Sequence, residues 1–303
     1  MRGMLSSGSY RPVFSGHETF PLRQLWLRKA FDAAQDNANG SRKTSPFVSD
    51  DAIAQLGVGK NMVNAIRHWA MACRVIDDQD RPTELGKLLL GTQGLDRFCE
   101  HPATPWLVHW HLAGDGHRST TWYWLFNHIS QQTFDAETIL ESLRDYAAER
   151  KVRGAASTLK RDIECCLRSY VPRVGQESPE DVTDCVLGEL GLLHARGKTY
   201  EFRRGRKPSL PDGMFGYALL DYWSRHGKAA TTLSFDRIAH EYGSPGRVFK
   251  LDENAVADRL ANLPKLSRNR LLWTETAGMR QVVYRAKEPL DSAKLKLLET
   301  AYA

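Results

Sequence analysis

The segment that most constrains this chain spans residues 49–74 and reads SDDAIAQLGVGKNMVNAIRHWAMACR. It has the helix start and stop signals of a helix-turn-helix, because a short helix ends in LGVG and a second helix begins at Lys60. Gly57 suits the left-handed or crowded backbone of a tight turn between helices. The segment therefore predicts two short helices joined at a sharp angle.

The spacing of apolar and polar residues in this segment gives the second helix two different faces. Val63 and Ile66 are spaced to pack this helix back onto Ile53 and Leu56. The outward face then carries polar side chains that can hydrogen-bond to base edges and phosphates. These candidate DNA-binding residues are Lys60, Asn61, Asn64 and Arg67. The alternative is an ordinary helical hairpin with a solvated polar face.

The residues that follow this segment extend the same unit. Residues 75–76, Val-Ile, resemble a strand, residues 77–81 a polar turn, and residues 82–91 a short helix. This order suits a winged helix-turn-helix better than a bare one. We therefore predict an N-terminal winged helix-turn-helix-like domain over residues 14–91.

A helical middle domain is predicted over residues 92–172. Its aromatic residues recur at helical spacing without interleaved Arg or Lys, which favours a core over a base-stacking platform. They are Trp106, Trp110, Trp122, Tyr123, Trp124 and Phe126.

The end of the middle domain contains a second predicted helix-turn-helix. An amphipathic helix is predicted over residues 134–150. Gly154 interrupts the helical pattern, and another helix begins near Ser157. Thr158, Lys160 and Arg161 then lie at the exposed N-terminal end, where recognition helices meet phosphates and bases. The alternative is a surface helix that happens to begin with two basic residues.

A C-terminal winged-helix-like domain is predicted over residues 185–290. Helical patterns are followed by LLWTETAGMRQVVYR, which alternates like a pair of strands. The basic string RRGRKP, in the same region, suggests contact with phosphates. Its cationic residues are Arg203, Arg204, Arg206 and Lys207. The expected fold is mainly α, with small β-hairpin wings on modules around a helical middle domain.

Composition narrows the class of protein. Hydrophobic residues make up 42% of the 303 residues, charged residues 26%, and the net charge is +6. These values are typical of a soluble globular chain and modestly favour a polyanionic partner. No apolar run of membrane-spanning length and no signal-peptide core are present, so we expect no membrane association and a cytoplasmic location.

The sequence contains no strong catalytic signature. We therefore expect no enzymatic activity, no cofactor and no bound metal. His17 and Glu18 could support acid–base work, although a local capping turn is the simpler interpretation. His109, His111 and His117 cluster, but side chains at i and i+2 of a helix point apart, which disfavours metal binding. The cysteines show no CxxC pair; Cys165 and Cys166 are adjacent and are expected in or near the core.

Several separated strings together resemble one bacterial family, the domain of unknown function 4007. They are FSGHETFPLR, TTWYWLFNH, STLKRD, LGELGLL, SPGRVFKLDE and TAGMRQV, and they extend over residues 14–285. The resemblance implies a genomic neighbourhood with phosphoadenosine-phosphosulfate-reductase-like proteins. It also implies a link to phage-defence or DNA phosphorothioation-like systems. It supplies no active-site residue.

Together these observations favour a non-enzymatic protein that binds double-stranded DNA. It would be an accessory or regulatory component of a sulfur-based DNA modification or phage-defence system. The first alternative is a protein-interaction adaptor for a reductase-like partner, without DNA binding of its own. A second alternative is an enzyme subunit that uses His17 and Glu18.

Overall fold

The computed structural model describes residues 3–40, 45–48, 51–152, 156–171, 185–227, 230–276 and 278–303. Helices predominate, and the strands form two small three-stranded antiparallel sheets. The mainly α fold class is thereby confirmed. None of the helices in the described part of the chain is long and apolar enough to cross a bilayer.

The N-terminal region contains the two helices and the tight turn between them that the sequence predicts. Its elements are η1 (Gly3–Ser6), α1 (Trp26–Asn39), α2 (Ala52–Leu56), α3 (Lys60–Ala72) and α4 (Glu84–Leu90). Gly57 ends α2 with φ +64°, the left-handed conformation expected of the turn. Val63 and Leu56 are buried as predicted, but the side chain of Ile53 is 48% exposed. The expectation that Ile53 supports α3 was wrong, since α3 packs on α1 as well as on α2.

The wing predicted after α3 does not form a pair of strands. Only one β-bridge, between Ile76 and Pro82, occurs in this stretch of the described chain. The reason is a self-contained turn, in which the Asp77 carboxylate accepts hydrogen bonds from the backbone N–H groups of Gln79 and Arg81. Residues 77–81 close on themselves and leave no length for a hairpin.

The centre of the molecule is aromatic and buried. It consists of α5 (Ala103–Trp110), a π-helical turn η2 (His111–Asp115) and α6 (Thr120–His128). Trp106, Trp110, Trp122 and Phe126 are each at most 1% exposed, which confirms the prediction that these aromatic residues form core.

A small sheet joins two parts of the chain that lie far apart in sequence. The elements are β1 (Thr133–Asp135), α7 (Ala136–Glu149), α8 (Ala156–Arg168), η3 (Gly188–Leu190), β2 (Leu193–Arg196) and β3 (Thr199–Phe202). β3 pairs with both β2 and β1, and Phe134 lies opposite Tyr200. Residues 193–202 fall within the C-terminal domain predicted over residues 185–290. The hydrogen bonds of β3 instead attach this hairpin to β1 in the middle of the chain.

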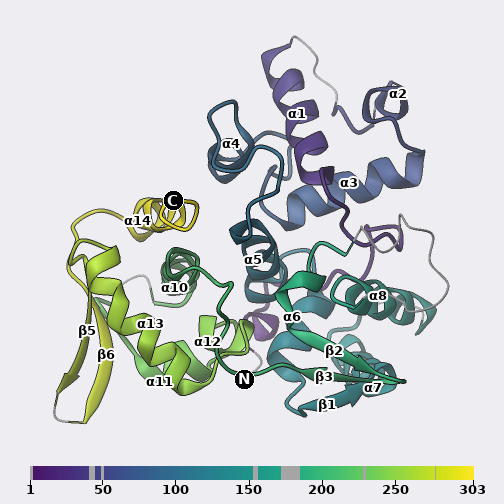
Figure 1. The fold of residues 1–303 in the computed structure, drawn as a ribbon. Coiled ribbons are helices and arrows are strands. Elements are labelled where there is room, and N and C mark those ends of the chain that lie inside the picture. Colours follow the sequence, from purple (N-terminus) through teal and green to yellow (C-terminus); the bar gives the residue numbers. More distant parts are fainter. Residues whose placement is uncertain are drawn as a thin grey trace.

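The C-terminal part repeats this order of elements. It contains α10 (Asp212–His226), β4 (Thr232–Ser234), α11 (Phe235–His240), α12 (Pro245–Val248), α13 (Glu253–Leu266), β5 (Leu271–Thr276), β6 (Met279–Tyr284) and α14 (Leu290–Glu299). Its sheet has the order β4-β6-β5, which matches β1-β3-β2. We call residues 120–202 the middle module and residues 212–284 the C-terminal module. Figure 1 shows the C-terminal module and α14 on one side of α5, with α1 and α3 of the N-terminal region and α7 and α8 of the middle module on the other.

Candidate nucleic-acid interface

The first predicted surface, on α3, is only partly available. Lys60, Asn61 and Asn64 are exposed on the first turns of the helix. Arg67, the fourth predicted residue, donates from Nε to Oδ1 of Asp80 at 2.7 Å. Asp80 is 4% exposed, so Arg67 neutralises a buried carboxylate and its guanidinium already has a structural partner.

The second predicted surface is the N-terminal half of α8. Lys160 and Arg161 are exposed and Thr158 is half-buried, whereas Leu159 and Ile163 face the core. The strong division between polar and apolar sides of this helix places its cations outward. Glu164 is exposed on the same helix and reduces its net positive charge.

The hairpin of the middle module adds cations that sequence reasoning missed. Its tip, Arg196-Gly197-Lys198, is exposed. Gly197 has φ +63°, which the tight turn requires. The Arg196 guanidinium lies 2.9 Å from Glu201, while Lys198 has no ion pair among the described residues. The signal was present in the string HARGKTYEF, but the hairpin could be recognised as part of this module only from its pairing with β1.

The basic string at residues 203–207 follows β3 directly and divides into two kinds of residue. Arg203 and Arg204 are exposed. Arg206 is exposed too, but its Nη2 lies 3.0 Å from a carboxylate oxygen of Asp258 on α13. Lys207 is 6% exposed and donates from Nζ to the Arg203 carbonyl at 2.6 Å. Burial lowers the pKa of Lys207 to about 8, and its ammonium is committed to the fold.

The equivalent surface of the C-terminal module carries charges of both signs. On α13, Glu253 and Asp258 are exposed, and Lys265 is the basic residue of its last turn. The tip of the β5–β6 hairpin carries Glu275 and Arg280, which lie opposite each other, and Met279. Exposed cations and carboxylates are therefore mixed on the C-terminal module.

The His17–Glu18 pair considered for acid–base work is divided by the fold. His17 is 3% exposed, and Glu18 lies at the surface. The backbone N–H of Thr19 donates to His17 Nδ1, so the proton lies on Nε2, which contacts Asp162 of α8 at 2.6 Å. Thr121 of α6 donates to the same carboxylate. Both ring nitrogens are therefore occupied: Nδ1 by Thr19 within the N-terminal segment, and Nε2 by Asp162, which also joins α8 to Thr121 of α6.

The other histidines of the predicted cluster have separate partners. His109 bonds through its two nitrogens to the Tyr170 hydroxyl and the Val248 carbonyl, and His111 contacts the Tyr217 hydroxyl. His117 lies near the surface, 3.9 Å from Asp78. Within the described ranges, no three His, Cys, Asp or Glu side chains gather as a metal site. Cys165 and Cys166 are buried, as expected.

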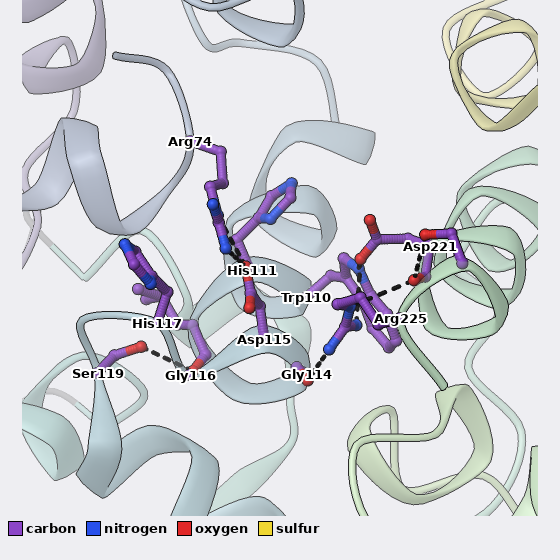
Figure 2. A network of polar contacts seen from close by, with 12 residues as sticks. Arg74, Trp110, His111, Gly114, Asp115, Gly116, His117, Ser119, Asp221 and Arg225 are labelled. Carbon is purple, nitrogen blue, oxygen red and sulfur yellow. Dashed lines mark hydrogen bonds and ion pairs between the residues drawn. The ribbon is translucent and has the colours of Figure 1, made fainter. Parts of the chain in front are cut away.

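A polar network around η2 ties the three parts of the chain together (Figure 2). Arg74, which follows α3, donates to Asp115 of η2. Arg225 of α10 donates to the Gly114 carbonyl at 3.0 Å and to Asp221 at 3.1 Å. Asp221 also accepts a hydrogen bond from the Trp110 indole at 2.9 Å. Trp110, Asp115 and Asp221 are buried and paired, so the network holds the parts of the molecule in one arrangement.

Comparison with known proteins identifies the family of this chain. The model of the family "Protein of unknown function (DUF4007)" matches residues 14–302, so the chain belongs to that family. A magnesium ion-bound SspB crystal structure is similar, with a TM-score of 0.86 and 29% identity over 100% of this chain and 90% of that one. A second SspB crystal structure has a TM-score of 0.83 and 30% identity, over 97% of this chain and 88% of that one. No curated protein matches the chain.

Proposed function

We propose that this DUF4007 protein binds double-stranded DNA, chiefly through its middle module. The order helix–strand–helix–helix–hairpin, with the first strand beside the last, supports the assignment of a winged helix-turn-helix. In such a module the second helix of the pair enters the major groove with its N-terminal residues foremost. Here that helix is α8, with Lys160 and Arg161 exposed near its start.

The observation that carries the proposal is a group of exposed cations on the middle module and in the two residues that follow it. They occur on α8, at the hairpin tip and immediately after β3, and they are Lys160, Arg161, Arg196, Lys198, Arg203 and Arg204. Each cation that contacts a phosphate releases condensed counterions, which supplies affinity without sequence information. The exposed residues at the start of α3 form a second, weaker contact in this proposal.

The wider role follows the family resemblance. We propose that the protein is a non-catalytic component of a sulfur-based DNA modification or phage-defence system, and that it presents DNA to a reductase-like partner or regulates the operon. SspB has been crystallised with a magnesium ion. The buried carboxylates of this chain do not fit that ion, because Asp115, Asp162 and Asp221 are already engaged by arginine, histidine or lysine. The proposed function therefore includes no step through magnesium.

The test is the affinity for duplex DNA, measured by fluorescence anisotropy over a series of salt concentrations. Lys160→Ala/Arg161→Ala should weaken binding about tenfold near 150 mM salt and should reduce the log–log salt slope by roughly 2. The matched control is Lys265→Ala/Lys287→Ala, which removes the same charge from exposed positions outside the middle module. Equal affinities of the two double variants would remove the middle module as the DNA surface.

The adaptor alternative has one supporting observation. Val48 and Ile53, on either side of the start of α2, are 72% and 48% exposed, and such apolar exposure is typical of protein-contact surfaces. Val48→Ser/Ile53→Ser should abolish co-purification with the neighbouring reductase-like protein if that surface binds it. Retained DNA affinity in this variant would separate the two roles. A wild-type protein without DNA affinity that still co-purifies would favour the adaptor.

A further inference from the structure

A cleft of about 500 Å³ lies apart from the proposed DNA surface. One wall is the N-terminal segment, the second is the turn before α6, and the third is the end of α10. Its polar lining includes Ser7, Ser9, Arg11, His117, Arg118, Arg225 and His226. Met4, Tyr10 and Val13 supply apolar lining. A volume of this size is typical of small-molecule sites.

The walls of the cleft are fixed by hydrogen bonds between segments. The Tyr10 hydroxyl donates to the Gly116 carbonyl at 2.9 Å, and Arg150, which follows α7, donates to the carbonyls of Ser7 and Tyr10 at 2.8 Å. On the opposite wall, Arg225 is held by the Gly114 carbonyl and Asp221, as Figure 2 shows. The N-terminal segment is therefore anchored to the turn before α6 and to the residue that follows α7.

The arginines that line the cleft retain donors for a ligand. Arg11 is exposed and makes no ion pair within the described part of the chain. Arg118 uses one Nη2 donor on Asp78 at 2.6 Å, while its Nε is buried and has no hydrogen-bond partner among the described residues. Arg225 uses three of its five donors on protein oxygens. The carboxylates nearest to these cations, Asp78 and Asp221, each already accept from an arginine.

We propose that this cleft binds a small organic phosphate. Three arginines from separate segments line the cleft, and phosphate accepts paired hydrogen bonds from arginine. The apolar residues Met4, Tyr10 and Val13 give the organic part of the ligand a surface to pack on. This site is separate from the proposed contact with DNA, since none of its residues belongs to α3, α8 or the segment after β3.

The two histidines add hydrogen bonding rather than charge at neutral pH. Burial lowers the pKa of both His117 and His226 below its ordinary value. His117 is faced by Arg74 and Arg118 as well as by Asp115 and Asp78. The positive charge that a phosphate meets therefore comes from the arginines.

Isothermal titration calorimetry with three probes tests the proposal: inorganic phosphate, phenyl phosphate and adenosine monophosphate. The wild-type protein should bind at least one of the two organic phosphates more tightly than inorganic phosphate, and adenosine should bind at least tenfold more weakly than adenosine monophosphate. Arg11→Ala should weaken the bound organic phosphate at least fivefold. Ser9→Glu, which brings a carboxylate to an exposed position of the lining, should abolish binding. Absence of binding by all three probes at 10 mM would overturn the proposal.

Two controls separate this site from the DNA surface. Arg144→Ala removes an exposed arginine from α7, whose nearest carboxylate contact is 4.0 Å away, and it should leave phosphate affinity unchanged. Arg11→Ala and Ser9→Glu should leave duplex DNA affinity unchanged. If they weaken DNA binding while the small phosphates do not bind, the cleft is part of the DNA surface and the small-ligand site is refuted. Loss of DNA binding by the α8 variant alone would leave the cleft proposal standing.

Discussion

Arg67 shows how a residue predicted to contact DNA can be required by the fold. Its guanidinium lies 2.7 Å from Asp80, whose side chain is 4% exposed. Arg67→Ala should lower the free energy of unfolding by about 1–2 kcal/mol, because the buried Asp80 carboxylate loses its partner. Lys60→Ala should change it by less than about 0.5 kcal/mol, as expected of an exposed substitution. Urea unfolding of both variants measures the difference.

A double variant distinguishes loss of this pair from loss of packing. Arg67→Ala/Asp80→Asn removes the unpaired charge, and it should recover part of the stability lost in Arg67→Ala. If the stability losses of Arg67→Ala and Asp80→Asn add up to the loss in the double variant, the ion pair contributes nothing beyond its separate side chains. DNA affinity of Arg67→Ala should be compared only under conditions where the variant is fully folded.

Lys207 gives a pH dependence whose sign can be worked out. Its pKa is about 8 in the folded protein, because burial disfavours the charged ammonium, and about 10.4 in an unfolded chain. Between these values the unfolded chain binds more protons, so stability rises with pH by on the order of 1 kcal/mol per unit. Lys207→Met should flatten this rise. Urea unfolding at pH 7.5, 8.5 and 9.5 checks it, and equal slopes for wild type and variant would contradict the assignment.

At the scale of elements, the two modules share an order of helices and strands but not a surface. Removal of the exposed lysine at the middle hairpin tip, Lys198→Ala, should weaken duplex DNA binding about two- to fivefold and should reduce the salt slope by about 1. Lys265→Ala on α13 should have no effect, because the exposed Glu253 and Asp258 make that helix unfavourable for phosphate. Anisotropy titrations at two salt concentrations compare the variants. A larger loss from Lys265→Ala would assign DNA to the C-terminal module instead.

The sequence predicts local elements better than it predicts their partners. Gly57 and the apolar spacing of Val63 are local signals, and both are confirmed. The strand at residues 133–135 is too short for a clear alternation, and its pairing with β3 spans more than sixty residues of chain. No local pattern assigns that hairpin to its module. For the same reason the sequence could propose Lys207 as a phosphate contact but could not show its burial.

At the scale of the whole molecule, long-range polar contacts decide which candidate residues are free. His17 is bound by Asp162 on α8, away from its neighbour Glu18. Arg67 is bound by Asp80 in the turn after α3. Both partners are aspartates that carry no sequence signal of their own. The candidate DNA surface could therefore be predicted in part, as exposed cations, whereas the cations used to assemble the fold appear only in three dimensions.

Asp221 should control how the parts of the molecule unfold together. It accepts hydrogen bonds from Trp110 of α5, Arg225 of its own helix and Lys294 of α14. Burial raises its pKa, but Arg225 and Lys294 outweigh this and hold it below the ordinary value of an aspartate. The charged form therefore contributes stability above about pH 4, and this contribution is lost as the pH falls toward the folded pKa.

Asp221→Asn should therefore lower the free energy of unfolding by about 3 kcal/mol at pH 7, since two buried or half-buried cations lose their anion. Part of the wild-type loss of stability below pH 4 should be missing in the variant. Asp258→Asn, which breaks an exposed pair with Arg206, should cost less than about 1 kcal/mol. Differential scanning calorimetry at pH 7 and pH 3.5 measures both. Asp221 joins α5 to α10 and α14. The Asp221→Asn variant should therefore unfold in two steps where the wild type unfolds in one. A single sharp transition in the variant would show that other contacts couple the modules.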